Sequence, residues 1–382
     1  MKIAVAKEAD DTRVAITPDT VKRYVGLGAT VAIEAGAGAE ARVTDAAYAE
    51  MGATMVGSAA EAVSGADMIL TVRRPSAETL GAAKAGALVI GALDPFGDRE
   101  GLQEMADAGV SSVAMELMPR ITRAQSMDIL SSQANLAGYQ AVIDAAELFD
   151  RAIPMMMTAA GTVPAAKVFV MGAGVAGLQA IATARRLGGA VSATDVRPAA
   201  KEQVASLGAK FVAVENDEFK QAQDAGGYAK EMSDDYKRQQ AELVASHIAK
   251  QDIVITTALI PGRPAPKLVS AEMVAAMAPG SVIVDLAVER GGNVDGAEFG
   301  SVVETANGVK IVGYRNVPGR IAATASLLYA KNLFTFVDTT LINKENKALE
   351  PKWDDELMTA TLLTKDGKLV HPRFGGEAPA AA

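Results

Sequence analysis

The sequence predicts an α/β protein with two doubly wound parallel sheets and a cleft between the two domains. Short apolar runs alternate with helix-length stretches from the first residues onward. This alternation stops at one long helical stretch and then starts again in the second half of the chain. With 382 residues, 49% of them hydrophobic, the chain is long enough to form two cores of ordinary size.

The first half of the chain contains a series of strand-like runs separated by Ala-rich segments. They read KIAVA, TVAIEAG, DMILTV, ALVIGAL and VSSVAMEL. Short apolar runs between helical segments are typical of parallel strands whose two faces are both covered. The amphipathic stretch from Met127 to Phe149 comes next, and we expect it to connect the two domains.

The second half repeats the same rhythm through KVFVMG, AVSATD, AKFVAV, DIVITTAL, SVIVDLAV and GVKIVGY. A helix-length run follows Pro318, and in LLTKDGKLVH the pair Asp366 and Gly367 predicts a tight hairpin. We expect this tail to pack on the first domain. The predicted domains are therefore 1–137 plus 320–382, and 138–319.

Composition excludes several classes of function. The net charge of −9 comes from acidic and basic residues mixed along the chain, so there is no basic stripe for a nucleic acid. The chain has no cysteine, which excludes disulfides, thiolate nucleophiles and thiolate metal sites. The only imidazoles are those of His247 and His371. No apolar run approaches the roughly 20 residues that span a bilayer, so we expect a chain without a membrane span.

The strongest motif is the turn formed by Gly172, Gly174 and Gly177, which follows an apolar strand and opens a helix. In a dinucleotide-binding turn the first glycine allows the sharp reversal and the second lets a pyrophosphate approach the backbone. The third glycine lets the helix pack closely on the strand, and the helix N-terminus receives the phosphates. The earlier pair Gly36 and Gly38 lacks a third glycine and is interpreted as a loop.

Asp195 ends the next strand, about 20 residues after the turn, where a carboxylate accepts hydrogen bonds from the adenosine ribose. The same carboxylate repels a 2′-phosphate, which favours NAD over NADP, although Arg197 nearby is a residue type that accepts that phosphate. The predicted cofactor-binding residues of this region are Gly172, Ala173, Gly174, Val175, Gly177, Asp195, Val196 and Arg197.

A polar cluster lies at the start of the long helical stretch. Asp128, Ser131 and Asn135 are three and four residues apart, so on a helix they share one face, and Arg120 and Gln125 come just before them. From the spacing alone, the simpler interpretation is a solvated helix face with Ser126 as its N-cap.

Several long stretches together resemble the NAD(H)-binding components of the proton-translocating transhydrogenase family, which is grouped with alanine dehydrogenase. They are RITRAQSMDILSSQANLAGYQAV, VFVMGAGVAGLQAIATARRLGG, TDVRPAAKEQVASLGAKF, TTALIPGRPAPKLVS and VDLAVERGGN. The resemblance covers nearly the whole chain. It implies a soluble subunit that passes hydride between its NAD(H) and NADP(H) on a partner component, coupled to proton translocation. It also implies a homodimer that associates with a membrane-spanning subunit at the cytoplasmic face of the inner membrane.

The resemblance implies roles for the polar cluster. Arg120 bonds the nicotinamide carboxamide, and Gln125 bridges toward the nucleotide of the partner. Asp128 and Ser131 fix the loop and the nicotinamide.

The resemblance also assigns Gly227, Tyr228 and Met232 to a mobile closing loop. Their segment, 223–240, is polar and long for a compact domain, so from the residues alone it is either a surface loop or a lid. Ala258 and Leu259 follow a strand at its carboxyl end, where such sheets bind ligands. The resemblance places them at the ribose, while strand-end packing is the alternative.

Two other functions compete with this interpretation. KEADDTRVAITP resembles the N-terminus of alanine dehydrogenase, and Arg13 matches the arginine that holds the pyruvate carboxylate there. That enzyme also needs a lysine and a histidine, where this chain offers Arg73, Arg74 and Asp94. Hydride transfer between two nicotinamides needs no general acid or base, so their absence fits a transhydrogenase. An NAD-sensing module without chemistry is the third hypothesis.

Overall fold

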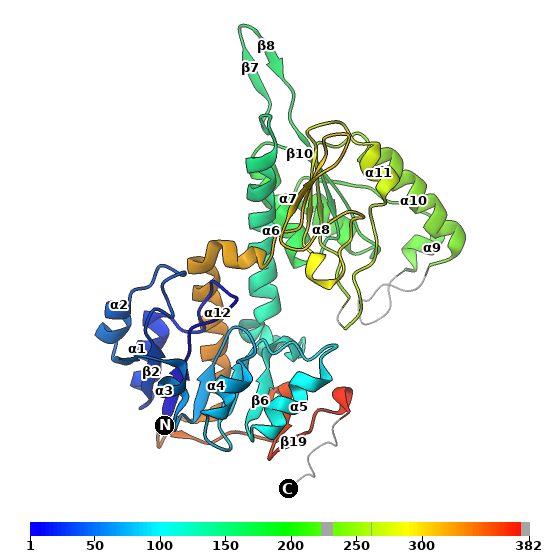
Figure 1. Cartoon of the computed structure of the whole chain (residues 1–382). Helices are drawn as coiled ribbons and strands as arrows, with labels where there is room; N and C mark the ends of the chain where they lie inside the picture. Colours follow the sequence, from blue (N-terminus) through cyan, green and yellow to red (C-terminus); the bar gives the residue numbers. More distant parts are fainter. Residues whose placement is uncertain (223–231, 261, 376–382) are drawn as a thin grey trace. The chain divides into compact units, whose positions relative to one another are not determined.

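A computed structural model describes residues 1–222, 232–260 and 262–375 of the chain. The chain forms two compact units, which are drawn in Figure 1. Unit 1 comprises Met1–Gln133 and Pro318–Ala382, and unit 2 comprises Ala134–Val317. Each unit contains a largely parallel sheet with helices, so the predicted Rossmann-like α/β fold class is confirmed.

Unit 1 is built on an eight-stranded sheet of order β19-β18-β6-β5-β4-β1-β2-β3. The strands are β1 (Lys2–Val5), β2 (Thr30–Glu34), β3 (Ala53–Val56), β4 (Met68–Leu70), β5 (Leu88–Gly91), β6 (Ser111–Ala114), β18 (Leu362–Lys365) and β19 (Lys368–Leu369). Strands β1 to β6 are parallel, whereas β18 runs antiparallel to both β6 and β19. Asp366 and Gly367 both have positive φ in the β18–β19 turn, so the predicted hairpin is present.

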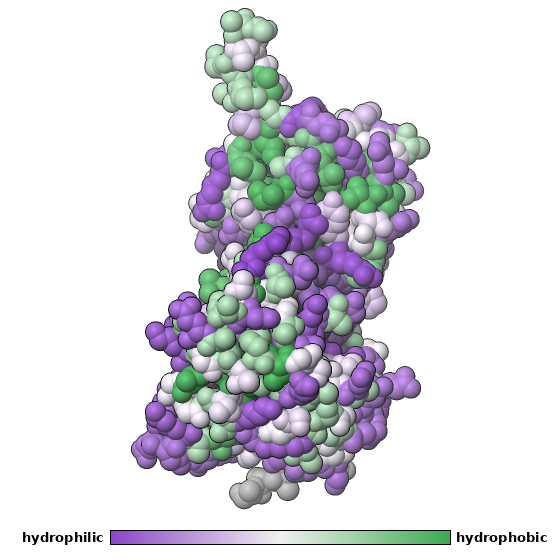
Figure 2. Space-filling view, turned by 60° about the vertical axis from the view of Figure 1, so that its left-hand side comes forward, coloured by the Kyte–Doolittle hydropathy of each residue, from purple (hydrophilic) through white to green (hydrophobic). Residues whose placement is uncertain are grey.

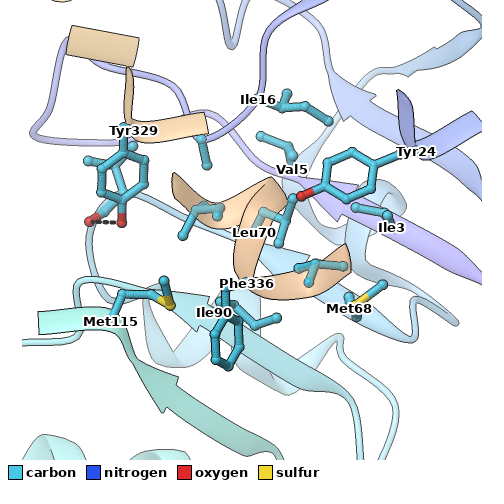
Figure 3. Close-up of a cluster of buried hydrophobic side chains, with 14 of the residues drawn as sticks. Ile3, Val5, Ile16, Tyr24, Met68, Leu70, Ile90, Met115, Tyr329 and Phe336 are labelled. Atoms are coloured by element: carbon cyan, nitrogen blue, oxygen red, sulfur yellow. Dashed lines mark hydrogen bonds between the residues drawn. The ribbon is translucent and has the colours of Figure 1, made fainter. Parts of the chain in front are cut away.

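Helices surround this sheet, and the tail of the chain adds to its core. They are α1 (Pro18–Gly26), α2 (Asp45–Glu50), α3 (Ala59–Val63), α4 (Ala77–Gly81), α5 (Arg99–Asp107), α12 (Ala322–Phe336) and α13 (Glu356–Thr361). Figure 3 shows Tyr329 and Phe336 of α12 among buried side chains from β1, β4 and β5. The Tyr329 hydroxyl donates to the Thr71 carbonyl at 3.0 Å and accepts from the Ala92 N–H at 2.9 Å. Residues far apart in the sequence therefore share one core.

Unit 2 is built on a seven-stranded sheet of order β11-β10-β9-β12-β13-β15-β14. The strands are β9 (Lys167–Met171), β10 (Ala190–Thr194), β11 (Lys210–Phe211), β12 (Ile253–Thr256), β13 (Val282–Asp285), β14 (Val302–Glu304) and β15 (Lys310–Val312). All neighbours are parallel except β14 and β15. Because the strand order reverses between β9 and β12, the carboxyl ends of these two strands form the switch point at which such sheets bind ligands.

The helices of unit 2 are α7 (Val175–Arg186), α8 (Ala200–Ser206), α9 (Asp217–Lys220), α10 (Asp234–Ile248) and α11 (Ala271–Ala275). The long helix α6 (Ile129–Leu148) crosses the boundary between the units. Among the described residues, no helix combines the length and the apolar character that crossing a membrane requires.

Some short strands were not predicted from the sequence. The edge strand β14 is largely exposed, and the runs at β3 and β14 are too short for a clear alternation. The hairpin of β7 (Met156–Thr158) and β8 (Gly161–Val163) was not predicted either, and its six strand residues are all exposed. An exposed hairpin buries no face of its own, so no alternating apolar pattern marks it in the sequence.

Candidate functional site

The Gly172 turn connects β9 to α7 at the switch point of the unit 2 sheet. Gly172 has a φ of 104°, which disfavours any residue with a side chain. A Cβ on Gly177 would lie 2.8 Å from the carbonyl carbon of Gly172 and closer still to its oxygen, so the helix packs directly on the turn. A Cβ on Gly174 would meet no atom within 4 Å. Gly172 is thus needed for its backbone conformation and Gly177 for close packing, while Gly174 faces open space.

The open space at Gly174 adjoins the N-terminus of α7. Gly174 is the N-cap residue, and the first N–H groups of a helix have no helical carbonyl to bind. Val175, the first helical residue, is 42% exposed. These N–H groups and the helix dipole attract an anion, and the missing side chain of Gly174 leaves room for it. The geometry therefore fits the pyrophosphate of a dinucleotide.

Asp195 follows β10 and binds back to the glycine turn. Its Oδ2 accepts from the Ala173 N–H at 2.7 Å, and the side chain is only 7% exposed. Arg197 donates to the same carboxylate from its backbone N–H and from Nε, both at 2.9 Å. The hydrogen bond to Asp195 raises the pKa of Arg197, and the charge of the carboxylate adds to that shift. Asp195 thus holds the cation that would otherwise be available to a 2′-phosphate.

The end of β12 forms the other side of the switch point. The Thr257 hydroxyl donates to the Gly172 carbonyl at 3.2 Å and so joins the strand end to the glycine turn. Leu259 is 51% exposed. Ala258 is held by the Asn293 side chain, which accepts from its N–H at 3.1 Å and donates to its carbonyl at 2.9 Å. The predicted residues Ala258 and Leu259 therefore follow directly on the contact with the turn.

Sequence reasoning missed the residues that support this strand end. Asn293 is fully buried, and its backbone N–H donates to Asp285, which is also fully buried at the end of β13. The Asp285 carboxylate also accepts from the N–H groups of Ala287 and Val294. Burial raises the pKa of Asp285, whereas its hydrogen bonds from these backbone groups lower it. The sequence signal that could have indicated these residues is Asp285 at the end of a buried strand, followed by Asn293 directly after Gly291 and Gly292.

Gly138 of α6 was missed as well. A Cβ there would lie 2.8 Å from the carbonyl carbon of Ala176, so α6 touches the first turn of α7 backbone to backbone. A glycine within a helix has a cost that is repaid only by such an approach. This contact sets the position of the helix N-terminus that faces the predicted phosphate site.

The polar cluster lies where η2 (Thr122–Met127) leads into α6, with Arg120, Gln125, Asp128 and Ser131 in unit 1 and Asn135 in unit 2. Arg120 and Gln125 are both exposed. The Asp128 carboxylate accepts from the Ser131 N–H at 2.9 Å and from its hydroxyl at 2.5 Å. Asp128 therefore caps the helix, and the expectation that Ser126 is the N-cap is wrong, because η2 occupies the chain up to Met127.

Comparison with known proteins identifies the family. Models described as the N-terminal and C-terminal domains of alanine dehydrogenase/PNT match residues 4–137 and 141–372. The chain is 53% identical to the first part of NAD(P) transhydrogenase subunit alpha of Rhodospirillum rubrum, over 99% of this chain and 100% of that protein. It is 46% identical to the protein of the same name in Rickettsia prowazekii, with coverage of 97% and 96%. The chain belongs to the alanine dehydrogenase/PNT family.

Solved structures agree with this assignment. A crystal structure of transhydrogenase from Sinorhizobium meliloti is 61% identical, with a TM-score of 0.88 and coverage of 97% of this chain and 100% of that one. An L-alanine dehydrogenase structure is 26% identical, with a TM-score of 0.81 and coverage of 98% of each chain. The predicted resemblance to transhydrogenase alpha subunits is confirmed, and alanine dehydrogenase is the more distant branch of the family.

The two branches can be compared at Arg13, the candidate carboxylate ligand. Its Nε and one terminal nitrogen donate to Asp11 at 2.9 and 2.7 Å, and its other terminal nitrogen donates to Gln133 at 2.8 Å. Arg13 is 7% exposed, and the Asp11 side chain is fully buried. Burial would raise the pKa of Asp11, but hydrogen bonds and charge from Arg13 lower it to about 2. The guanidinium therefore already has a carboxylate partner within the chain.

Neither histidine is arranged as a catalytic base. His247 lies 2.8 Å from the Ser192 hydroxyl and packs edge-on against Phe169, which is fully buried in the unit 2 core. His371 lies in the tail, with its Nε2 3.2 Å from the Ala360 carbonyl. Burial lowers the pKa of both imidazoles, so both favour the neutral form near neutral pH.

The segment 223–240, predicted as a loop, is described from Met232 onward, and its residues 234–240 belong to helix α10 instead. Met232 is 9% exposed and packs in a small cluster with Phe219, Ala222 and Tyr236. Gly227 and Tyr228 lie outside the described residues.

Proposed function

We propose that this chain is the NAD(H)-binding alpha subunit of a proton-translocating transhydrogenase. In this role it supports direct hydride transfer between NAD(H) in unit 2 and NADP(H) on a partner component. The observation that carries the proposal is the Gly172 turn joined to the Asp195 carboxylate, in a chain whose relatives bear the name NAD(P) transhydrogenase subunit alpha.

In this proposal the residues of unit 2 hold the cofactor. Gly174 and the first turn of α7 receive the pyrophosphate, while Gly172 and Gly177 keep that turn close to the sheet. Asp195 accepts the adenosine ribose hydroxyls and keeps Arg197 from a 2′-phosphate, which favours NAD(H). The remaining contacts come from residues beside these groups: Ala173, Val175, Val196, Ala258 and Leu259, with Met232, Gly227 and Tyr228 from the closing loop.

The loop of residues 120–131 acts on the nicotinamide end. Arg120 and Gln125 are exposed at the surface of unit 1, which suits side chains that must meet a ligand or a partner. Arg120 would bond the carboxamide, and Gln125 would bridge toward the nucleotide of the partner. Asp128 and Ser131 bind each other at the start of α6, which keeps that end of the loop in one conformation.

The bound nicotinamide supplies the hydride chemistry itself. Hydride transfer between two nicotinamides moves no proton at that step, so the protein must orient the rings and exclude water but needs no general base. This agrees with the structural positions of His247 and His371. The contacts of Arg13 also argue against an alanine dehydrogenase function. Arg13 is bound to Asp11 and Gln133 and does not offer its charge to a substrate carboxylate.

Proton translocation requires further chains in this proposal. The names of the bacterial relatives describe them as the first part of subunit alpha, which implies other parts. The partners we propose are an NADP(H)-binding component and a membrane-spanning subunit, with this chain attached peripherally on the cytoplasmic face of the inner membrane.

The β7–β8 hairpin supports the proposal of a homodimer. It extends away from the unit 2 sheet in Figure 1, and Figure 2 shows few strongly hydrophilic side chains on it. Its exposed apolar residues are Met155, Met156, Met157 and Val163, with Met157 at 78%. An isolated two-stranded hairpin is only marginally stable in water, and exposed apolar patches mark interaction sites. A second copy of this chain is the partner we infer, since two-fold dimers are the commonest oligomers.

The proposal is tested by mixing the purified chain with an NADP(H)-binding transhydrogenase component and following hydride exchange between NADH and an NADP analogue. A parallel assay supplies alanine and NAD. We expect exchange in the first assay and no alanine oxidation in the second. Alanine oxidation without exchange would reject the transhydrogenase function, and tight NADH binding without either reaction would favour an NAD-sensing module.

The loop has its own test with a matched pair of variants. Arg120→Ala should reduce the exchange rate by roughly 100-fold, because a misplaced nicotinamide loses the near-attack geometry. Arg23→Ala removes an exposed arginine from α1 and should leave the rate unchanged. Equal rates for the two variants would exclude Arg120 from the site.

A further inference from the structure

The carboxamide of Asn332 joins the end of η2 to the first turn of α6. Asn332 lies on α12 and is 8% exposed. Its Nδ2 donates to the Ser126 carbonyl at 2.8 Å, and its Oδ1 accepts from the Ser132 hydroxyl at 2.7 Å. Ser126 follows Gln125 directly, and Ser132 follows Ser131. The buried Asn332 side chain therefore holds the backbone next to Gln125 and the Ser132 side chain next to Ser131.

The loop contains the 3-10 helix η2, and Ala124 and Met127 anchor it in the core, but the backbone contact at its end is weak. The turn from Gln125 to Asp128 is closed by an N–H to carbonyl contact of 3.5 Å, which is at the limit of a hydrogen bond. The Asn332 contact at 2.8 Å is far better formed. The end of η2 is therefore also held by a side chain from the tail of the chain, 206 residues beyond Ser126.

A row of buried polar side chains contacts Ser132, the residue that donates to Asn332. The Gln133 amide nitrogen lies 3.3 Å from the Ser132 hydroxyl and 3.2 Å from the Ala325 carbonyl. Its oxygen accepts from Arg13, which in turn binds the fully buried Asp11. Polar groups at such burial are retained only when their hydrogen bonds are satisfied, so a satisfied row like this one allows a single arrangement.

We propose that Asn332 is a positioning residue for hydride transfer, which holds the C-terminal part of the loop of residues 120–131 in its productive conformation through Ser126 and Ser132. The Asp11, Arg13 and Gln133 row fixes the other side of Ser132. This inference rests on the proposed function. It adds a set of residues that touch no substrate and act through the loop.

The inference is tested with Asn332→Asp, which keeps the size of the side chain but replaces the N–H donor with a carboxylate oxygen facing the Ser126 carbonyl. We expect the rate of hydride exchange to fall about 10-fold or more, since small misplacements of reacting groups are costly. The Kd for NADH should change by less than about 2-fold, because the Gly172 turn and Asp195 in unit 2 are not altered. Trypsin should cleave after Arg120 and Arg123 faster than in the wild type.

Two further variants complete the design. Ser132→Ala removes only a hydroxyl, so it reports on the same contact if Asn332→Asp fails to fold, and we expect about a 3-fold loss. The double variant should be no slower than Asn332→Asp alone, because residues of one network are not additive. Asn343→Ala is the control, as that side chain bonds Glu345 and Glu350 in the hairpin of β16 (Ile342–Asn343) and β17 (Ala348–Leu349).

The outcomes distinguish a failure of the positioning role from a failure of the proposed function. If the wild type exchanges hydride and Asn332→Asp or Ser132→Ala has a rate within about 2-fold of it, the positioning role alone is overturned. Equal losses of NADH affinity and rate also overturn it, because they indicate a general structural defect. A wild-type chain that exchanges no hydride refutes the proposed function itself.

Discussion

Gly174 and Gly177 are three residues apart, and we predict opposite consequences for their replacement by alanine. At Gly177 the new Cβ would lie 2.8 Å from the carbonyl carbon of Gly172, whereas ordinary contacts begin at 3.4 Å. The Gly172 carbonyl oxygen would lie closer still, so the start of α7 must move by more than the roughly 0.6 Å between these two distances, and the overpacking should cost about 3 kcal/mol, the upper end of the usual range. Alanine regains about 1 kcal/mol of helix propensity, so the net loss should be about 2 kcal/mol.

At Gly174 the new methyl group meets nothing within 4 Å, and φ is −76°, which alanine adopts readily. The free energy of unfolding should therefore change by about 1 kcal/mol or less, mainly from the poorer N-cap. The methyl group occupies the space proposed for the pyrophosphate. We expect the Kd for NADH to rise by about 10-fold or more, because the phosphates lose their contact with the helix N-terminus.

Urea unfolding followed by far-UV circular dichroism measures stability here, because the single tryptophan, Trp353, lies in unit 1 and reports poorly on unit 2. Titration of NADH fluorescence measures the affinity. A Gly174→Ala protein that binds NADH as tightly as the wild type would refute the placement of the pyrophosphate. An unchanged unfolding midpoint for Gly177→Ala would refute the packing argument.

Further predictions concern pH, specificity and assembly. Burial raises the pKa of Glu116 from 4.5 to about 7, so the folded protein binds this proton more tightly than the unfolded chain. The free energy of unfolding should therefore fall by up to about 3 kcal/mol as the pH rises from about 5 to about 8, and chemical unfolding of Glu116→Gln should show that much less pH dependence. Asp195→Asn should weaken NADH binding about 10-fold and release Arg197, so that discrimination against NADPH decreases in fluorescence titrations; unchanged discrimination would contradict the role of Asp195. Met157→Asp should convert the dimer to monomers in sedimentation experiments, and a wild-type chain that sediments as a monomer would exclude the homodimer.

The sequence was most informative where local patterns determine structure. The apolar runs of β9, β10, β12 and β13 are buried on both faces and stand out as continuous hydrophobic segments. The glycine turn and the hairpin at Asp366 were also predictable, because positive φ selects particular residue types within a few positions. In each case the physical constraint and its sequence signal lie in the same short segment.

The residues that escaped prediction act across long separations in the chain. The Asn293 side chain hydrogen-bonds the Ala258 backbone, and Asn332 hydrogen-bonds the Ser126 carbonyl. The residues around each asparagine in the sequence do not indicate such a distant partner. The N-cap of α6 was misplaced by two residues for a related reason. Ser126 and Asp128 are both good cap residues, and only the 3-10 turn up to Met127 decides between them.

Arg13 shows why a residue match to a relative needs the structure for its interpretation. The resemblance placed it at the arginine that binds a substrate carboxylate in alanine dehydrogenase, and the residue type is the same. Here a buried aspartate two positions earlier supplies the carboxylate, and the remaining guanidinium nitrogen binds Gln133. The Asp11 carboxylate also binds Arg73 at 2.9 Å, and the loss of Asp11 would leave the Arg13 guanidinium as a buried charge. The Arg13 guanidinium is therefore fully engaged by groups of its own chain, which supports our proposal that it belongs to the network around the loop and not to a substrate site.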